Sequence, residues 1–247
     1  MELLLLSNST QHGRGYLEHV LDTVAGFVGG SGSRLAFVPY ALADHDGYTD
    51  RVRAALEPVG ISVRGVHEGA DPVAELAAAD AVFVGGGNSF RLLGALYRTG
   101  LRDALRAAVR DGLRYMGASA GTNMAAPTLR TTNDMPIVQP PSFEALGFVP
   151  FQINPHYLDP DPSSTHKGET REVRLTEFLE ENDVPVLGLR EGAWLRVSDG
   201  RAVVDGVPEG ARPGRLFRRG AEPAELAAGT DLSELLAAQP RFDCPGY

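Results

Sequence analysis

Short apolar runs alternate with helical patterns through the first half of the chain. The runs predict buried strands at Leu3–Leu6, Leu35–Val38, Ile61–Val66, Ala81–Val84 and Tyr115–Ala118. Apolar residues spaced three or four apart predict helices at Tyr16–Val28, Asp50–Leu56, Asp71–Ala78, Ser89–Tyr97 and Leu101–Asp111. Thr49, Asp71 and Ser89 are the expected N-caps. This alternation predicts an α/β domain with a parallel sheet covered by helices on both faces.

Small, polar and turn-forming residues follow directly after the predicted strands. These segments are Ser7–Thr10, Pro39–Tyr40, Gly85–Asn88 and Ser119–Asn123. Since ligands bind outside the carboxyl ends of the strands in open parallel sheets, we expect these segments to meet at a site.

The pattern changes after Ala126. The segment from Arg130 to Phe151 is rich in loops and prolines. Beyond it we expect a helix at Glu169–Glu181, with Val173, Phe178 and Leu179 on one side. The expected strands are Gln152–Ile153, which is brief, Val186–Leu189, Trp194–Val197 and Ala202–Val204. The sequence Ser198-Asp199-Gly200 predicts a hairpin between the last two strands. We expect residues 1–219 to form one domain, and residues 220–247 to be an appended, mobile tail with a short amphipathic stretch at Leu232–Ala238.

Composition and charge exclude several classes of protein. The chain has 247 residues, a net charge of −9 and no long basic run, so we expect no binding to nucleic acid. Cys244 is the single cysteine, which excludes an internal disulfide and a cysteine-based metal cluster and favours a reducing, cytoplasmic location. The apolar run Leu3–Leu6 is too short for a signal peptide or a membrane span, and no membrane partner is expected.

The sharpest local motif is Gly117-Ala118-Ser119-Ala120-Gly121, placed after a predicted strand and before a predicted helix. A nucleophile elbow needs this arrangement, because small neighbours let the backbone turn sharply and expose the serine hydroxyl. The alternative is a tight glycine-rich turn that binds nothing.

A serine nucleophile needs a base and a group that orients the base. Among six histidines, His156 differs because it follows a short strand and Pro155, where its imidazole could project over the carboxyl edge of the sheet. Two carboxylates are candidates for the third member, Asp134 and Glu191. Asp134 could instead be an Asx-turn residue, and Glu191 could pair with Arg190 on the surface.

The run Gly85-Gly86-Gly87-Asn88 is a weak phosphate-binding signal, because it lacks the spacing of a dinucleotide fingerprint and of a P-loop. Backbone N–H groups of Gly86 or Gly87, together with that of Ala120, could form an oxyanion hole. A plain strand-to-helix turn is the alternative.

Taken together, several stretches resemble peptidase E, the α-aspartyl dipeptidase family. The resemblance covers roughly Met1 to Phe217 and rests on Met1–Thr10, Gly85–Asn88, Gly117–Gly121, Arg130–Val138, Asn154–His156, His166–Glu172 and Glu191–Trp194. It implies a serine peptidase that hydrolyses dipeptides with N-terminal aspartate. The implied fold is a flavodoxin-like α/β sheet related to class I glutamine amidotransferases. The implied activity requires no metal and no organic cofactor.

Within this resemblance, Ser119 matches the family nucleophile and His156 its base, and the acid matches Asp134 or Glu191. Arg171 is the expected partner of the aspartate side chain, because guanidinium binds carboxylate bidentately, and Asn88 is expected to hold other polar groups of the substrate. The alternative for Arg171 is an ion pair with Glu172 or Glu169 on the helix surface.

Two positions depart from the family motif. Ala118 stands where tryptophan is frequent and Thr122 where alanine is common, so a smaller residue 118 could widen the pocket and relax selectivity.

Three other functions remain open at this point. They are a cyanophycinase-like peptidase for β-aspartyl bonds, an α/β-hydrolase esterase, and a non-catalytic module that binds a small anion. Ser119, Asp134 and His156 follow the chain order of the esterases, but too few residues separate them for the intervening strands and helices. The chain is expected to be a monomer or a homodimer.

Overall fold

The large sheet is a mixed sheet whose centre is parallel. The structure is a computed structural model that describes residues 1–160, 163, 165, 168–207 and 210–244. In this part of the chain the sheet has eight strands in the order β12-β9-β8-β1-β5-β4-β2-β3. The bounds are β1 Leu3–Leu6, β2 Arg34–Val38, β3 Ser62–Gly65, β4 Ala81–Val84, β5 Arg114–Ala118, β8 Trp194–Ser198, β9 Arg201–Asp205 and β12 Thr230–Asp231. Strands β1 to β5 pair in parallel, whereas β8, β9 and β12 are antiparallel to their neighbours.

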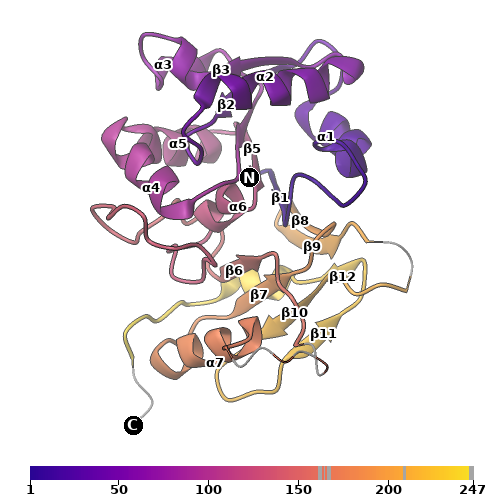
Figure 1. Cartoon of the computed structure of the whole chain (residues 1–247), viewed down its shortest axis with the longest axis vertical. Helices are drawn as coiled ribbons and strands as arrows, with labels where there is room; N and C mark the ends of the chain where they lie inside the picture. The colour runs from indigo at the N-terminus through magenta and orange to yellow at the C-terminus, as the bar shows by residue number, and fades with distance from the viewer. Residues whose placement is uncertain (161–162, 164, 166–167, 208–209, 245–247) are drawn as a thin grey trace.

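Helices cover both faces of this sheet, as the alternation of strands and helices predicted (Figure 1). Their bounds are α1 Leu21–Val28, α2 His45–Leu56, α3 Ala74–Ala77, α4 Ser89–Arg98, α5 Leu101–Arg110, α6 Ala120–Ala125 and α7 Arg171–Glu181, with 3-10 turns at Glu18–Val20, Glu57–Val59, Val66–Glu68 and Ser233–Ala237. Alternate residues of each strand enter different cores: Leu4 and Leu6 pack with α1 and α2, and Leu3 and Leu5 pack with α4, α5 and α6. The fold class predicted from the sequence is therefore confirmed.

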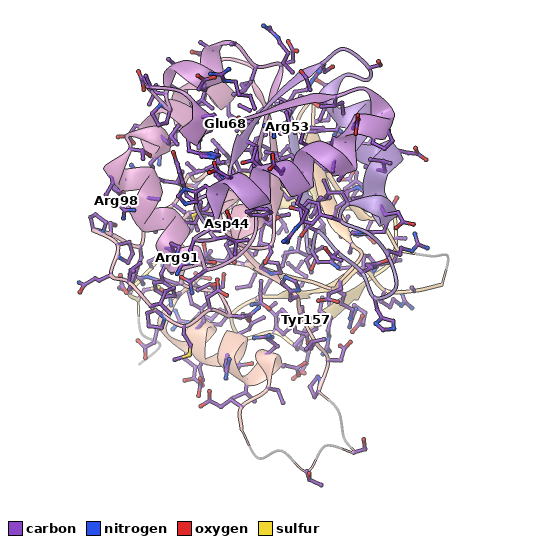
Figure 2. The ribbon with its side chains drawn as sticks, turned by 45° about the horizontal axis from the view of Figure 1, so that its top comes forward. Asp44, Arg53, Glu68, Arg91, Arg98 and Tyr157 are labelled. Atoms are coloured by element: carbon purple, nitrogen blue, oxygen red, sulfur yellow. The ribbon has the colours of Figure 1, made fainter. Side chains whose placement is uncertain are left out.

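Three helices begin at residues other than the expected N-caps. The N-cap of α3 is Val73, not Asp71. The N-cap of α2 is Asp44, whose side chain accepts a hydrogen bond from Gly47 N–H, and Figure 2 shows Asp44 at one end of this helix. Thr49 lies inside α2, where its hydroxyl donates to the carbonyl of His45. The N-cap of α4 is Asn88, not Ser89, because the Asn88 side chain accepts from Arg91 N–H.

A second, smaller sheet was not predicted. Its order is β11-β10-β7-β6, with β6 Gln152–Pro155, β7 Val186–Leu189, β10 Gly214–Phe217 and β11 Ala224–Leu226. Figure 1 shows this sheet and α7 below the large sheet. Helix α7 buries Leu175 and Leu179, whereas Val173, expected on the inner side, is exposed. The hairpin between β8 and β9 forms as predicted around Asp199 and Gly200.

The segment after Gly220 differs from the expected appended tail. It supplies β11 to the small sheet and β12 to the edge of the large sheet. Leu226, Leu232 and Leu235 are buried in the same core as β1 and β5. These three leucines contribute to a shared core, so the described part of residues 220–247 is integral to the fold.

Candidate active site

Ser119 lies in a strained turn between β5 and α6. Its backbone has φ 53° and ψ −111°, a conformation that side chains other than glycine rarely adopt. The flanking glycines are required by close backbone contacts: a Cβ on Gly117 would lie 2.6 Å from the carbonyl oxygen of Gly121, and one on Gly121 would lie 2.0 Å from that of Val84. This is the geometry that the pentapeptide predicted for a nucleophile elbow.

His156 and Glu191 complete a chain of hydrogen bonds that begins at Ser119. The Oγ of Ser119 is 2.9 Å from Nε2 of His156, and Nδ1 of His156 is 2.7 Å from Oε1 of Glu191. The side chains of His156 and Glu191 are 35% and 52% exposed, so water reaches both. An imidazole between a hydroxyl and a carboxylate can take the hydroxyl proton while the carboxylate fixes its tautomer and stabilises the cation.

Asp134, the other candidate acid, lies elsewhere. Its Oδ2 accepts hydrogen bonds from the backbone N–H of Ser89, at 2.7 Å, and from the hydroxyl of Thr132, at 3.2 Å. Asp134 therefore ties the 130–151 loop to the first turn of α4, where a carboxylate is favoured by the helix dipole. Among the described residues, Asp134 forms no hydrogen bond with the imidazole that Glu191 holds.

Two polar residues that sequence analysis did not single out hold the two sheets in register at this site. The Ser7 hydroxyl donates to the carbonyl of Leu189, at 2.8 Å, and accepts from the backbone N–H of His156, at 2.9 Å. Asn8 accepts from the N–H of Gly192, beside Glu191, at 2.7 Å. Both side chains are buried at the end of β1. The signal in the sequence was a pair of polar residues directly after an apolar strand, which marked a loop without showing what the loop contacts.

The glycine turn after β4 lies beside the serine. A Cβ on Gly86 would be 3.0 Å from the Cβ of Ser119, and Gly87 has φ 136°, so backbone approaches the hydroxyl without an intervening side chain. Ala120 is the first residue of α6, and its N–H belongs to the unpaired first turn of that helix. Tyr48 packs against this turn, and burial raises the pKa of its hydroxyl.

A pocket of about 280 Å³ opens in front of Ser119 and His156. Its wall includes Tyr16, Tyr48 and Arg51, together with Gly86, Gly87 and residues of the loop after β1. A larger hollow of about 800 Å³ lies between α7 and the segment after β10 and does not include the serine. We take the smaller pocket as the candidate active site because the hydroxyl and the imidazole face it.

The side chains expected to contact substrate have mixed positions. Arg171 begins α7, and its Nε is buried without a hydrogen-bond partner among the described residues. Burial and nearby Arg174 lower the pKa of Arg171, and the charge of Asp134 raises it. The alternative ion pairs are not formed, because Glu169 pairs with Arg174 and Glu172 with Arg215.

Asn88 and the two departures from the family motif have structural roles instead. Both ends of the Asn88 amide are occupied, since Oδ1 caps α4 and Nδ2 donates to the carbonyl of Met135. Ala118 is fully buried in the core beside α1 and α2, so it does not widen the pocket. The buried hydroxyl of Thr122 donates to the carbonyl of Leu6 at 2.6 Å. His166 and Lys167, which belong to the resembling stretch 166–172, lie outside the described residues.

Two further properties bear on function. In the described residues, no three His, Cys, Asp or Glu side chains are grouped so that they could hold a metal ion. No helix in the same part of the chain has the length and apolar character needed to cross a membrane.

Comparison with known proteins identifies the family. The model of peptidase family S51 matches residues 3–204. "Peptidase E" of Streptomyces coelicolor is 77% identical over 243 residues, which cover 98% of each chain. "Probable alpha-aspartyl dipeptidase" of Drosophila melanogaster is 51% identical over 236 residues, covering 95% of this chain and 97% of the relative. The crystal structure of a peptidase from an acI-B1 Actinobacterium has the same fold, with a TM-score of 0.65 at 16% identity over 94% of this chain and 96% of that one. The chain belongs to peptidase family S51.

Proposed function

We propose that this protein is a serine-type dipeptidase that hydrolyses dipeptides whose first residue is aspartate. The observation that carries the proposal is the line of hydrogen bonds from Ser119 through His156 to Glu191, formed at a strained turn beside a glycine-lined pocket. Relatives that match nearly the whole chain bear the names peptidase E and alpha-aspartyl dipeptidase, and these names support the reaction and the substrate class.

In the proposed mechanism, Nε2 of His156 takes the proton of Ser119 as Oγ attacks the carbonyl carbon of the aspartyl residue. The oxyanion receives hydrogen bonds from the N–H groups of Ala120 and Gly87, or Gly86. His156 then gives its proton to the leaving amine, the carbon–nitrogen bond breaks, and an acyl-enzyme remains. Water, deprotonated by His156, attacks this ester and releases aspartate with the Ser119 hydroxyl restored.

We assign the third position to Glu191. Its carboxylate accepts from Nδ1 of His156, whereas the carboxylate of Asp134 is used by Ser89 and Thr132. The role proposed for Asp134 is to hold the start of α4, and with it the neighbouring glycine turn, in place.

Arg171 is the proposed partner of the aspartate side chain. Its buried, unpartnered Nε leaves a charged donor available, and Asp134 lies close enough to influence it. Arg171→Met should lower kcat/KM for Asp-Leu far more than for Asn-Leu, because only the former substrate loses an ion pair. An unchanged ratio of the two rates would remove Arg171 from substrate recognition.

The decisive experiment compares wild type with Ser119→Ala on a panel that varies the first residue among Asp, Glu, Asn and β-linked Asp. We expect wild type to cleave Asp-Leu and Ser119→Ala to lose most of its kcat. We also expect a fluorophosphonate probe to label the wild-type protein. Faster cleavage of β-Asp-Arg than of Asp-Leu would favour the cyanophycinase-like alternative. Absence of both turnover and labelling would favour a binding module.

The proposed setting is cytoplasmic, with small peptides as substrates and a monomer or homodimer as the working form. The single cysteine, Cys244, supports a reducing compartment. Size-exclusion chromatography with light scattering would measure the oligomeric state.

A further inference from the structure

Arg51 is a cation in the wall of the active-site pocket that the proposed mechanism leaves without a role. It lies on α2 and lines the same pocket as Ser119 and His156. Its side chain is exposed, and within the described residues it forms no ion pair. A guanidinium that borders a nucleophile and lacks a carboxylate partner is available to an anionic group of the substrate.

The acidic residues near Arg51 on α2 are all engaged elsewhere. Asp44 caps the helix through Gly47 N–H. Asp46 pairs with His67, and Asp50 pairs with Arg53. These three carboxylates thus bind other groups, so none of them neutralises the charge of Arg51 at the pocket.

Arg53 makes the contrast clear. It lies two residues further along α2 and is paired with both Asp50 and Glu68, 2.9 Å away in the latter case. Figure 2 shows Arg53 and Glu68 close to each other above α2. Arg53 therefore forms ion pairs within the fold, whereas Arg51 lines the pocket and has no carboxylate partner among the described residues.

A series of contacts connects Arg51 to the reacting atoms. The guanidinium carbon of Arg51 is 5.9 Å from the centre of the Tyr48 ring, and the hydroxyl of Tyr48 is 3.1 Å from that of Tyr16. Tyr48 packs on the glycine turn so closely that a Cβ on Gly85 would be 2.7 Å from its hydroxyl. Because that turn touches Ser119, Arg51 lies on the pocket side of the nucleophile.

We propose that Arg51 binds the free carboxylate of the substrate's second residue. This inference rests on the proposed dipeptidase function. The leaving amine must lie beside Nε2 of His156, which lines the same pocket as Arg51, so the second residue occupies this pocket. Its carboxylate is only one residue removed from the bond that is cleaved, and guanidinium is the side chain best suited to bind it. Arg51 thereby selects dipeptides over longer or amidated peptides.

The test compares Asp-Leu with Asp-Leu-amide, which differ only in the charge of the C-terminal group. We expect wild type to favour the free acid in kcat/KM by about 10- to 30-fold, the lower part of the range for a hydrogen bond to a charged group, because Arg51 is exposed to water. Arg51→Met should lose this preference by slowing only the free acid. Arg51→Lys should keep part of it, because the charge remains without the planar fork.

Arg53→Met is the matched control, since it removes one positive charge from the same helix. It should keep the wild-type ratio of the two substrates, even where its ion pairs contribute to stability. Thermal melts of all three variants establish that the compared proteins are folded.

Three results would overturn the proposal. The first is equal kcat/KM of wild type on Asp-Leu and Asp-Leu-amide. The second is a ratio of the two kcat/KM values that is unchanged in Arg51→Met. The third is an equal loss of kcat/KM on both substrates in Arg51→Met, which would place Arg51 at the aspartyl residue or at the reaction itself. Failure of folded wild type to cleave either substrate would instead reject the dipeptidase function, and the role of Arg51 with it.

Discussion

Ser7→Ala tests whether one buried hydroxyl aligns the two halves of the candidate active site. Ser119 extends from the large sheet, and His156 and Glu191 extend from the small one. The Ser7 hydroxyl joins the sheets, because it contacts both the backbone N–H of His156 and the carbonyl of Leu189. Alanine removes this link without adding volume.

The size of the effect follows from what is left unpaired. The carbonyl of Leu189 keeps its hydrogen bond from Tyr157 N–H, so the group that loses its partner is the N–H of His156. An unsatisfied N–H in a part-buried setting costs up to about 1–3 kcal/mol, which corresponds to a fall in melting temperature of about 2–12 °C for a chain of this size. His156 also has a positive φ of 54°, a strained conformation that this hydrogen bond helps to maintain. If relaxation displaces the imidazole by about 1 Å, kcat falls by up to about 100-fold.

The assay is steady-state hydrolysis of Asp-Leu, measured well below the melting temperature of each protein. We expect Ser7→Ala to lower kcat about 10- to 100-fold with little change in KM. Ser62→Ala, which removes an exposed hydroxyl from β3, should change neither kinetics nor melting. A lower melting temperature of Ser7→Ala with wild-type kcat would refute the reasoning, because Ser7 would then stabilise the fold without positioning His156.

Further predictions concern the acid, the elbow and the half-buried His19. Glu191→Gln keeps an oxygen that accepts a hydrogen bond from the imidazole but removes the negative charge of the carboxylate, so kcat should fall about 10- to 100-fold. Asp134→Asn should change melting temperature and KM more than kcat. A greater loss of kcat in Asp134→Asn at unchanged stability would contradict this assignment. Gly121→Ala places a Cβ 2.0 Å from a backbone carbonyl oxygen, so it should lower the free energy of unfolding in urea by at least about 1–3 kcal/mol and abolish activity. Gly26→Ala, with no atom within 4 Å of its Cβ, should be tolerated. Burial lowers the pKa of His19 from its ordinary 6.5, so the unfolded chain binds the proton more readily and the free energy of unfolding falls as the pH drops below 6.5. Urea unfolding measured above and below pH 6.5 should show a smaller fall in the free energy of unfolding for His19→Gln than for wild type.

Local patterns were sufficient to predict the parallel core. Strands β1, β2, β4 and β5 are short apolar runs next to helices, and their burial on both faces leaves almost no alternation to interpret, whereas β3 at the edge alternates exposed and buried residues. The errors in this half are at helix starts: Asp44 and Asn88, each just before the first residue of the observed helix, were passed over in favour of Thr49 and Ser89. Asp, Asn, Ser and Thr are all good N-caps, so residue type alone does not choose among neighbours.

The small sheet could not be predicted in the same way. Its strands β6, β7 and β10 come from segments far apart in the sequence, and β10 lies in a run where Gly214 and Arg215 interrupt the apolar pattern. Pairing between distant strands leaves no periodic signal in either strand. The segment after Gly220 failed as a prediction for the same reason, since its leucines become core residues only when β11 and β12 pair with strands elsewhere.

This second sheet also explains which parts of the site were predictable. Ser119 was marked by glycines that its own turn requires, and His156 by a position after a strand. The choice between Asp134 and Glu191 depended on how the two sheets meet, because Glu191 follows β7 and Asp134 reaches α4 across a loop. Positions that depend on a contact between sheets, such as Ser7, carry no signature beyond an unexpected polar residue.

The two arginines proposed for recognition resolve an apparent conflict of charge. An Asp-Xaa dipeptide carries two carboxylates, and the protein that we propose to bind it has a net charge of −9. Long-range repulsion therefore opposes binding, and screening of this repulsion by salt should assist it. Arg51 belongs to α2 and Arg171 to α7, and Figure 1 shows these two helices on opposite sides of α6. If each cation binds one carboxylate of the substrate, local ion pairs offset the unfavourable overall charge, and a peptide that lacks either carboxylate should be hydrolysed with a lower kcat/KM.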